Sequence, residues 1–344
     1  MKPTVRVLVV DDSAAMRGVI AAALRRDPSI EIVGGAGDPY EAREAIKTLN
    51  PDVMTLDVEM PRMDGLSFLE KVMRLRPFPV VMVSSLTPRG VDTALRALAL
   101  GAVDCVGKPD DKHPNSFEGL AATIRAAAFA RVSCQPRISS APPERFRPND
   151  RIVAIGASTG GVEALSKIVA GMPANCAPTL ITLHMPTPFT TSFARRLDEL
   201  TAARVMEARE GAALSPGIIL LAPGGAHLEI TNPRELRCKL ARSPPVNGHR
   251  PSVDVLFRSV AAVCGESALG VILTGMGQDG AAGLLAMRRA GARTLGQDAT
   301  TSLVYGMPRV AFERGAVEQQ ISLHDMSQKI LALTEDASRR NDIR

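Results

Sequence analysis

The sequence predicts an α/β protein of two domains joined by a linker. Its 344 residues exceed the size of one ordinary domain. In both halves, short β-branched runs alternate with amphipathic segments of helical period, a pattern typical of parallel sheets flanked by helices. Residues 133–149 hold four prolines and no hydrophobic period, which is typical of a semi-rigid linker. We therefore expect domains at 1–132 and 150–344.

The first domain is predicted to be a doubly wound parallel sheet of five strand–helix units. Buried strands are expected at 5–10, 30–34, 53–57, 79–84 and 102–106. Amphipathic helices are expected at 14–25, 40–49, 66–75, 91–100 and 118–132. Since such sheets bind ligands beyond the carboxyl ends of their strands, polar residues at those ends are candidate site residues.

The second domain is predicted to be an α/β domain with a mostly parallel sheet. Strands are expected at 152–155, 179–183 and 270–273, with shorter β-like pieces across about 205–240. Helices are expected at 162–169, 189–197, 253–263 and 280–289. The alternation again directs attention to the strand ends.

Composition narrows the classes of function. Hydrophobic residues make up 45% and charged residues 22% of the chain, enough apolar material for packed cores rather than a disordered chain. The net charge of +5 is spread thinly and aromatic residues are only 3%. Both observations argue against nucleic acid as a partner.

Cysteines and apolar runs bear on cellular location. Five scattered cysteines never form a CxxC pair, so free thiols in a reducing compartment are expected. No apolar run approaches the ~20 residues of a membrane span, and the first residues, MKPTVRVLVVDDS, do not form a signal peptide. We therefore expect a cytoplasmic protein with no direct membrane insertion.

Five polar residues follow strand ends of the first domain. Asp11 and Asp12 follow the first strand, and Asp57 ends the third. Ser84 ends the fourth strand, and Lys108 follows the fifth. Three carboxylates at one sheet edge repel one another unless a cation joins them, and Mg²⁺ prefers such oxygen ligands. One carboxylate could then attack a phosphoryl group, while the lysine and serine hold the transferred oxygens.

This domain resembles the receiver domain of two-component response regulators over about residues 4–130, on the motifs VVDDS, TLDVEMPRMDG, MVSSLT and a KP pair. The resemblance implies Asp57 as the phospho-acceptor and Mg²⁺ bound by Asp12, Asp57 and the backbone carbonyl of Glu59. The supporting residues would be Asp11, Ser84 and Lys108. Where receivers usually carry an aromatic switch residue, this chain has Cys105, which is a departure from the receiver pattern.

A candidate nucleophile follows the first strand of the second domain. GASTGG at 156–161 satisfies G-x-S-x-G, a sharp strand-to-helix turn that exposes a serine hydroxyl, here that of Ser158. Helix N-terminal amides at such a turn can stabilise an oxyanion. Two other interpretations stay open, because the glycines could cradle a phosphate and the serine could simply cap the helix.

A serine nucleophile needs a base and an acid that orients the base. His184 directly follows the strand at 179–183, beside Ser158 if the two strands are neighbours. The other histidines are His227 and His249, which stay open as alternatives in glycine-rich loops, and His113 and His324, which are poor candidates. Asp279 follows the strand at 270–273 and leads into a helix, so helix capping is its plainer interpretation.

The second domain resembles the catalytic domain of chemotaxis protein-glutamate methylesterases over about residues 150–320. The shared motifs are GASTGG, HMPTPFTTSFARRL, LLAPGGAHLEI, HRPSVDVLF, TGMGQDGAAGLLAMR and QDATTSLVYGMP. The resemblance implies Ser158 as nucleophile, His184 as base and Asp279 as its orienting acid. Backbone amides around Met276 would contribute to the oxyanion hole. Receiver, linker and catalytic domain together are similar to the chemotaxis response regulator methylesterases, the CheB family.

This resemblance implies a phosphorylation-regulated esterase that hydrolyses glutamate 5-O-methyl esters on chemoreceptors to glutamate and methanol, and that deamidates receptor glutamines. A chemotaxis histidine kinase would be the phosphodonor. Mg²⁺ would serve receiver phosphorylation, and the esterase reaction would need no cofactor. One alternative is a non-enzymatic regulator whose second domain binds a nucleotide or a partner through GASTGG. Another is a DNA-binding regulator, although the chain shows no evident helix-turn-helix.

Overall fold

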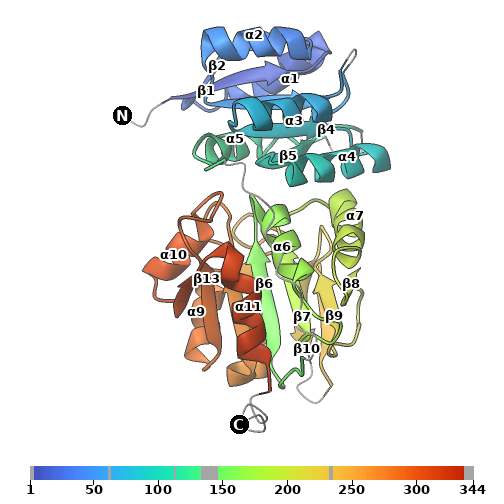
Figure 1. The fold of residues 1–344 in the computed structure, drawn as a ribbon, viewed down its shortest axis with the longest axis vertical. Helices are drawn as coiled ribbons and strands as arrows, with labels where there is room; N and C mark the ends of the chain where they lie inside the picture. The colour runs from blue at the N-terminus through green and yellow to red at the C-terminus, as the bar shows by residue number, and fades with distance from the viewer. Residues whose placement is uncertain (1–3, 61–62, 112–113, 133–145, 232–234, 337–344) are drawn as a thin grey trace. The chain divides into compact units, whose positions relative to one another are not determined.

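The computed structural model describes residues 4–60, 63–111, 114–132, 146–231 and 235–336. Contacts divide the chain into two units, Met1–Pro136 and Arg137–Arg344. Each unit has its own sheet flanked by helices (Figure 1). Most of the linker expected at 133–149 lies outside the described residues, so its boundaries stay a prediction.

The first unit is the predicted doubly wound sheet. Its strands are all parallel, in the order β2-β1-β3-β4-β5. They are β1 (Val5–Val10), β2 (Ile30–Ala36), β3 (Val53–Asp57), β4 (Val80–Ser84) and β5 (Asp104–Gly107). The helices are α1 (Ala14–Leu24), α2 (Pro39–Leu49), α3 (Gly65–Leu75), α4 (Pro88–Ala99) and α5 (Leu120–Ala128). Each predicted element is present, although α5 is shorter than the expected 118–132.

Local signals set the starts of these helices. The side chains of Ser13, Asp38, Asp64 and Thr87 each accept a hydrogen bond from an amide in the first turn of the helix that follows. Such caps satisfy amides that have no partner within the helix. β3 and β4, in contrast, are buried at every residue, because helices cover both faces of a parallel sheet. Polar side chains of these strands can reach solvent only at the strand ends.

The second unit contains a seven-stranded parallel sheet, in the order β14-β13-β12-β6-β7-β9-β8, and a separate antiparallel hairpin. The sheet strands are β6 (Ile152–Ala157), β7 (Thr179–Leu183), β8 (Arg204–Glu207), β9 (Ile218–Leu221), β12 (Ala268–Ile272), β13 (Arg293–Gln297) and β14 (Gln319–Ile321). The hairpin strands are β10 (His227–Thr231) and β11 (Arg237–Ala241).

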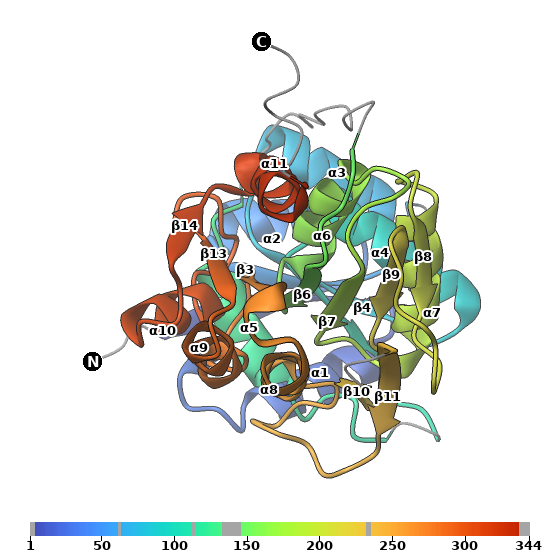
Figure 2. The ribbon, with the colours of Figure 1, turned by 90° about the horizontal axis from the view of Figure 1, so that it is seen from below.

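Helices cover both faces of this sheet. They are α6 (Gly161–Ala170), α7 (Thr187–Asp198), α8 (Val253–Cys264), α9 (Ala281–Arg289), α10 (Met307–Glu313) and α11 (Leu323–Thr334), with a short 3₁₀ turn, η1 (Gly265–Ser267). Helices α8 and α9 pack together on one face, and α6 and α11 pack together on the other (Figure 2). The predicted mostly parallel α/β architecture is therefore confirmed.

Strand β6 lies between β7 and β12. The chain continues from β6 to β7 on one side and returns later to β12 on the other. This reversal makes β6 a topological switch point, the place where doubly wound sheets bind ligands. The carboxyl ends of the three strands therefore meet, and they are the strands that precede Ser158, His184 and Asp279.

The chain beyond residue 290 holds elements that the sequence did not predict. β13 has the sequence RTLGQ, polar at three of its five residues, and β14 has only three residues. Neither carries a hydrophobic run that stands out. Helix α11 did carry a signal, since the Ser322 side chain caps it and its apolar residues recur at helical spacing.

The last residues of the expected linker are bound to the second unit. The side chain of Phe146 is buried, and the side-chain amide of Asn175 donates to the backbone carbonyl of Phe146 at 2.6 Å. The backbone N–H of Asn149 donates to the carbonyl of Thr334 at 2.8 Å. Residues 146–149 therefore extend the packed unit upstream of β6.

The described residues hold no helix that is both long and apolar enough to cross a bilayer. Four cysteines in this part of the chain are free thiols: Cys105, Cys176, Cys238 and Cys264. Cys134 and the candidate His113 lie outside the described residues.

Candidate functional site

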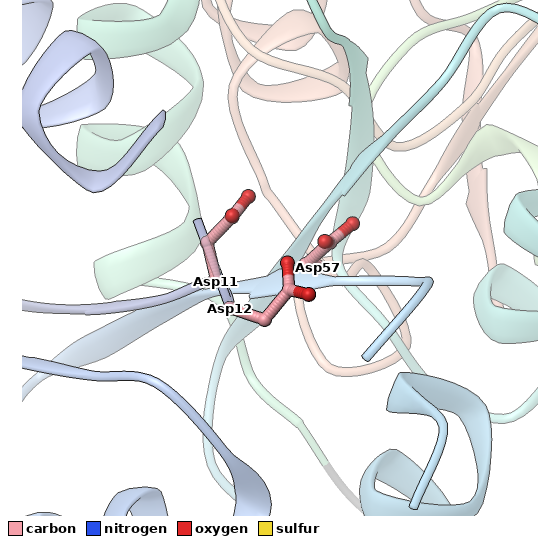
Figure 3. Close-up of side chains that lie close together, drawn as sticks. All are labelled: Asp11, Asp12 and Asp57. Atoms are coloured by element: carbon pink, nitrogen blue, oxygen red, sulfur yellow. The ribbon is translucent and has the colours of Figure 1, made fainter. Parts of the chain in front are cut away.

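Three carboxylates gather at the carboxyl edge of the first sheet. Asp11 and Asp12 follow β1 and Asp57 ends β3, and an oxygen of each lies within 4.8 Å of the others (Figure 3). Asp11 and Asp57 are buried, whereas Asp12 is exposed. The Lys108 ammonium lies 2.8 Å from Asp57 Oδ2 and 3.0 Å from Asp11 Oδ2. Four of the five residues predicted for this edge are thus in one cluster.

The charges in this cluster are not balanced. Burial raises the pKa of Asp57, and the neighbouring Lys108 ammonium opposes that shift. Burial alone would lower the pKa of Lys108, but its hydrogen bonds to Asp57 and Asp11 raise it above its usual value. Three carboxylates against one ammonium leave negative charge at a partly exposed edge. All of the donors are hard oxygens, so the cluster fits Mg²⁺.

Two further predicted residues are placed differently. The hydroxyl of Ser84 donates to the carbonyl of Gly90 at 3.0 Å, at the start of α4, and not to a carboxylate. Glu59 is exposed, and its N–H donates to Asp57 Oδ1 at 3.3 Å. The metal-binding role of its carbonyl stays a prediction.

Burial raises the pKa of the Cys105 thiol, so this thiol is a poor nucleophile.

Ser158 stands in the turn between β6 and α6. Its N–H donates to the carbonyl of Thr274 at 3.0 Å, and its own carbonyl accepts from Gly161 at 2.7 Å. Gly160 has a φ of +80°, a left-handed conformation that favours glycine. The turn is therefore sharp, and α6 begins at Gly161, three residues after the serine.

His184 joins Ser158 to Asp279. Its Nδ1 lies 3.1 Å from Ser158 Oγ, and its Nε2 lies 2.8 Å from Asp279 Oδ2. A carboxylate only accepts hydrogen bonds, so Nε2 carries the proton and Nδ1 presents a lone pair to the hydroxyl. This tautomer is the one that a general base requires. A phosphate-binding loop would not require this base.

Asp279 does not cap the helix that follows it. The N-cap of α9 is Gly280, with no side-chain hydrogen bond. The Asp279 carboxylate instead accepts hydrogen bonds at the start of α8, from Val253 N (2.7 Å), Asp254 N (3.3 Å) and Ser252 Oγ (2.8 Å). The capping interpretation was therefore wrong for α9, because the carboxylate serves the neighbouring helix.

The position of Asp279 stabilises its charge. Burial alone would raise its pKa, but hydrogen bonds from His184, Asn247 and the Val253 amide hold the pKa well below its usual value. The positive end of α8 acts in the same direction. Asp279 therefore stays ionised beside the imidazole and can stabilise an imidazolium.

The two alternative bases have other contacts. His227 is fully buried, with Nε2 3.1 Å from the carbonyl of Pro244 and Nδ1 accepting from the N–H of Ser252 at 3.1 Å. The ring of His249 is stacked on the ring of His184. Only His184, among the described histidines, is hydrogen-bonded to Ser158.

The turn after β12 packs against the serine. A Cβ atom at Gly275 would lie 2.7 Å from the Cβ of Ser158, so the approach requires glycine. The Gly275 N–H donates to Val304 at 3.1 Å, and its carbonyl accepts from Met307 at 2.8 Å. Met276 is the next residue along this restrained turn. Its contribution to an oxyanion hole stays a prediction.

Residues that the sequence analysis did not single out complete the site. Besides Ser252, the side chain of Asn247 donates to Asp279 Oδ1 at 2.8 Å and to Asp254 at 2.9 Å. Buried Gln297 accepts from the Thr274 N–H at 2.8 Å and so restrains the strand end before Gly275. The Asn-Gly dipeptide at 247–248 was the available signal for a tight turn.

Both units match known protein families. The CheB methylesterase family model matches residues 153–330, and the response regulator receiver domain model matches residues 7–114. A protein-glutamate methylesterase/protein-glutamine glutaminase 1 of Caulobacter vibrioides is 61% identical, over 96% of this chain and 98% of its own. The corresponding protein of Agrobacterium fabrum is 57% identical, over 97% and 98%. A crystal structure of the Thermotoga maritima CheB methylesterase catalytic domain is 34% identical, with a TM-score of 0.52 over 54% of this chain and 98% of that one.

Proposed function

This chain belongs to the CheB methylesterase family, and we propose that it hydrolyses glutamate 5-O-methyl esters on methyl-accepting chemoreceptors and deamidates receptor glutamines. The observation that carries the proposal is the hydrogen-bonded chain from Ser158 through His184 to Asp279, at the ends of three adjacent strands. Neither nucleotide binding nor DNA binding has a comparable observation in its favour among the described residues.

The acylation step uses each member of this chain. His184 accepts the Ser158 proton at Nδ1 while the serine Oγ attacks the ester carbonyl carbon. Backbone amides around Met276 are assigned to the oxyanion that forms. His184 then returns the proton to the methoxy oxygen, so that methanol leaves and an acyl-serine remains. Asp279 stabilises the imidazolium throughout.

Deacylation reverses the proton transfers. His184 accepts a proton from water, which attacks the acyl-serine, and then gives that proton to Ser158 Oγ as the acyl group leaves as a carboxylic acid. The acid gives its remaining proton to solvent and becomes the glutamate carboxylate. A glutamine side chain gives the same acyl-serine, with ammonia as the leaving group in place of methanol. The glutaminase reaction therefore needs no additional residue.

The receiver domain supplies regulation, with Asp57 as the proposed phospho-acceptor and a chemotaxis histidine kinase as phosphodonor. Asp12 and Asp57 would supply carboxylate oxygens for Mg²⁺, with the carbonyl of Glu59 as the proposed additional ligand and the Asp11 carboxylate beside them. Bound there, Mg²⁺ would offset the negative charge of the carboxylates and so reduce their repulsion of an incoming, negatively charged phosphoryl group. Lys108 already lies beside Asp57 and is placed to bind a transferred oxygen. The Ser84 hydroxyl must first break its hydrogen bond to the Gly90 carbonyl before it can donate to a transferred oxygen.

Asp57→Asn should abolish phosphorylation. With acetyl phosphate and Mg²⁺, the wild-type protein should gain one acid-stable, base-labile phosphoryl group, and EDTA should prevent this. An amide is too weak a nucleophile to accept the group. Asp111→Asn is the matched control, since Asp111 is an exposed aspartate of the same domain. Intact-protein mass spectrometry measures the labelling, and equal labelling of the two variants would contradict the assignment.

Phosphorylation should accelerate methyl-ester hydrolysis. We expect acetyl phosphate with Mg²⁺ to raise methanol release from methylated receptor by about 5–150-fold, the usual range for coupling between two sites. Asp57→Asn should show no increase, although its unstimulated rate should equal that of the wild type. A wild-type rate that does not respond to the phosphodonor, in protein shown to be labelled, would contradict regulation through Asp57.

A further inference from the structure

The imidazole of His249 lies in face-to-face contact with that of His184. The ring centroids are 3.6 Å apart, and the ring planes differ by 8°. No atom of the described residues hydrogen-bonds to a ring nitrogen of His249. Its contact with the site is therefore made through the flat face of the ring.

The two hydrogen bonds of His184 hold its ring weakly in one direction. Nδ1 and Nε2 are bonded to Ser158 and Asp279. Hydrogen bonds to imidazole nitrogens are made in the ring plane, so they oppose displacement of the ring toward either of its faces only weakly. A parallel ring at van der Waals distance blocks that displacement on one side.

A tight turn fixes the position of His249. The backbones of Val246 and His249 exchange two hydrogen bonds of 3.0 Å, and between them Asn247 and Gly248 have φ of +55° and +81°. Positive φ at both central residues is typical of a type I′ turn, which Asn-Gly favours. The Asn247 side chain of the same turn donates to Asp279. One turn therefore contacts the acid and the base together.

His249 stays neutral at pH values near 7. Burial, with a smaller contribution from His184, lowers the pKa of His249 to about 4, against an opposing effect of Asp279. A charged ring at this distance would oppose proton transfer to His184. A neutral ring instead offers its π face to the imidazolium that forms during the reaction.

We infer that His249 is a positioning residue for the hydrolysis: it holds the plane of the His184 ring and stabilises that ring while it carries the proton. The inference rests on the proposed function of the Ser158 site. It requires no proton transfer by His249 itself.

Three full-length variants test this role: His249→Ala, His249→Leu and His249→Phe. We measure kcat and KM for methanol release from methylated receptor, and the rate at which phenylmethylsulfonyl fluoride modifies Ser158. The Ala and Leu variants should lose about 10–100-fold in kcat, as expected for a displaced catalytic group. KM should change little, and sulfonylation should slow in proportion. The Phe variant should recover most of both rates, because its ring keeps a flat π face.

The Leu variant separates stacking from packing, since leucine fills the space without a flat face. Circular dichroism and thermal unfolding establish that each variant is folded, and the Leu and Phe pair decides the matter if the Ala variant is not. Equal kcat for the Leu and Phe variants would overturn the inference. If both turn over as fast as the wild type, no flat ring is needed at this position. If both are folded and slow, a ring nitrogen is required.

Ser158→Ala distinguishes a failure of this inference from a failure of the proposed function. The reagent should modify the wild type and not this variant at the active site. Wild-type protein that releases no methanol, or equal modification of wild type and Ser158→Ala, would contradict the proposed function. With that function intact, the variants of His249 report on positioning alone.

Discussion

Ser158→Ala should reduce methanol release from methylated receptor by at least about 10⁴-fold, because the members of a triad act as a unit and the nucleophile has no substitute. The loss should appear in kcat, since the serine bonds to the substrate only during the reaction. His184→Gln should lose activity to a similar extent. The half-buried Ser158 side chain caps no helix, so alanine should leave the free energy of unfolding nearly unchanged.

Two controls accompany this prediction. The Ser158→Ala protein should still take up a phosphoryl group at Asp57, which shows that the receiver domain is intact. His227→Gln should retain turnover in the folded fraction, because the ring of His227 bonds to backbone groups and not to Ser158. If His227→Gln is inactive although folded and His184→Gln turns over normally, the base has been assigned to the wrong histidine.

Asp279→Asn should lower kcat by about 10⁴-fold, the loss found when a triad carboxylate becomes an amide. An amide does not stabilise the imidazolium, and its NH₂ group can donate to Nε2 and so favour the wrong tautomer of His184. The same NH₂ group, in the place of Oδ2, would also face the N–H donor of Val253. We therefore also expect a loss of about 1–3 kcal/mol in the free energy of unfolding, the cost of unsatisfied buried donors.

Asp254→Asn is the matched control for this double effect. Asp254 is buried at the same helix junction, where its carboxylate accepts from the Gly283 N–H at 2.6 Å and from Asn247 at 2.9 Å. Its carboxylate makes no hydrogen bond to His184, so its variant should lose stability with a far smaller loss in kcat. Denaturant unfolding and methanol release measure the two effects separately. Similar kcat values for Asp279→Asn and Asp254→Asn would contradict the role assigned to Asp279.

The fold could be predicted wherever an element carries its own pattern. β3 is apolar except for Thr55 and its final aspartate, and it is buried at every residue, so its sequence is sufficient to identify a central strand. β13 is also largely buried, yet it contains Arg293, Thr294 and Gln297. There, burial depends on partners far along the chain, such as the amide of Thr274 that bonds to Gln297. No local pattern records that contact.

The residues of the candidate site also differ in whether a local sequence pattern predicts them. Ser158, His184 and Asp279 could be found because each follows a strand end, and strand ends of a parallel sheet share an edge. The residues that hold Asp279 could not be found in this way. Asn247 lies in a loop whose path depends on tertiary bonds, among them the bond from Ser252 to His227. An Asn-Gly pair predicts the turn, but not which carboxylate the turn will meet.

The central place of β12 has a consequence for biosynthesis. On one side, β6 pairs with β12, which is synthesised much later. A ribosome adds ~5–20 residues per second, so the chain from the end of β6 to the end of β12 takes roughly 6–23 s to make. During that time the nascent sheet ends in β6, a strand whose residues are all buried in the finished protein. Such an unpaired apolar edge readily pairs with other chains. A chain released before β12 would carry the serine and the histidine without the acid, and would be an aggregation-prone product rather than a partly active enzyme.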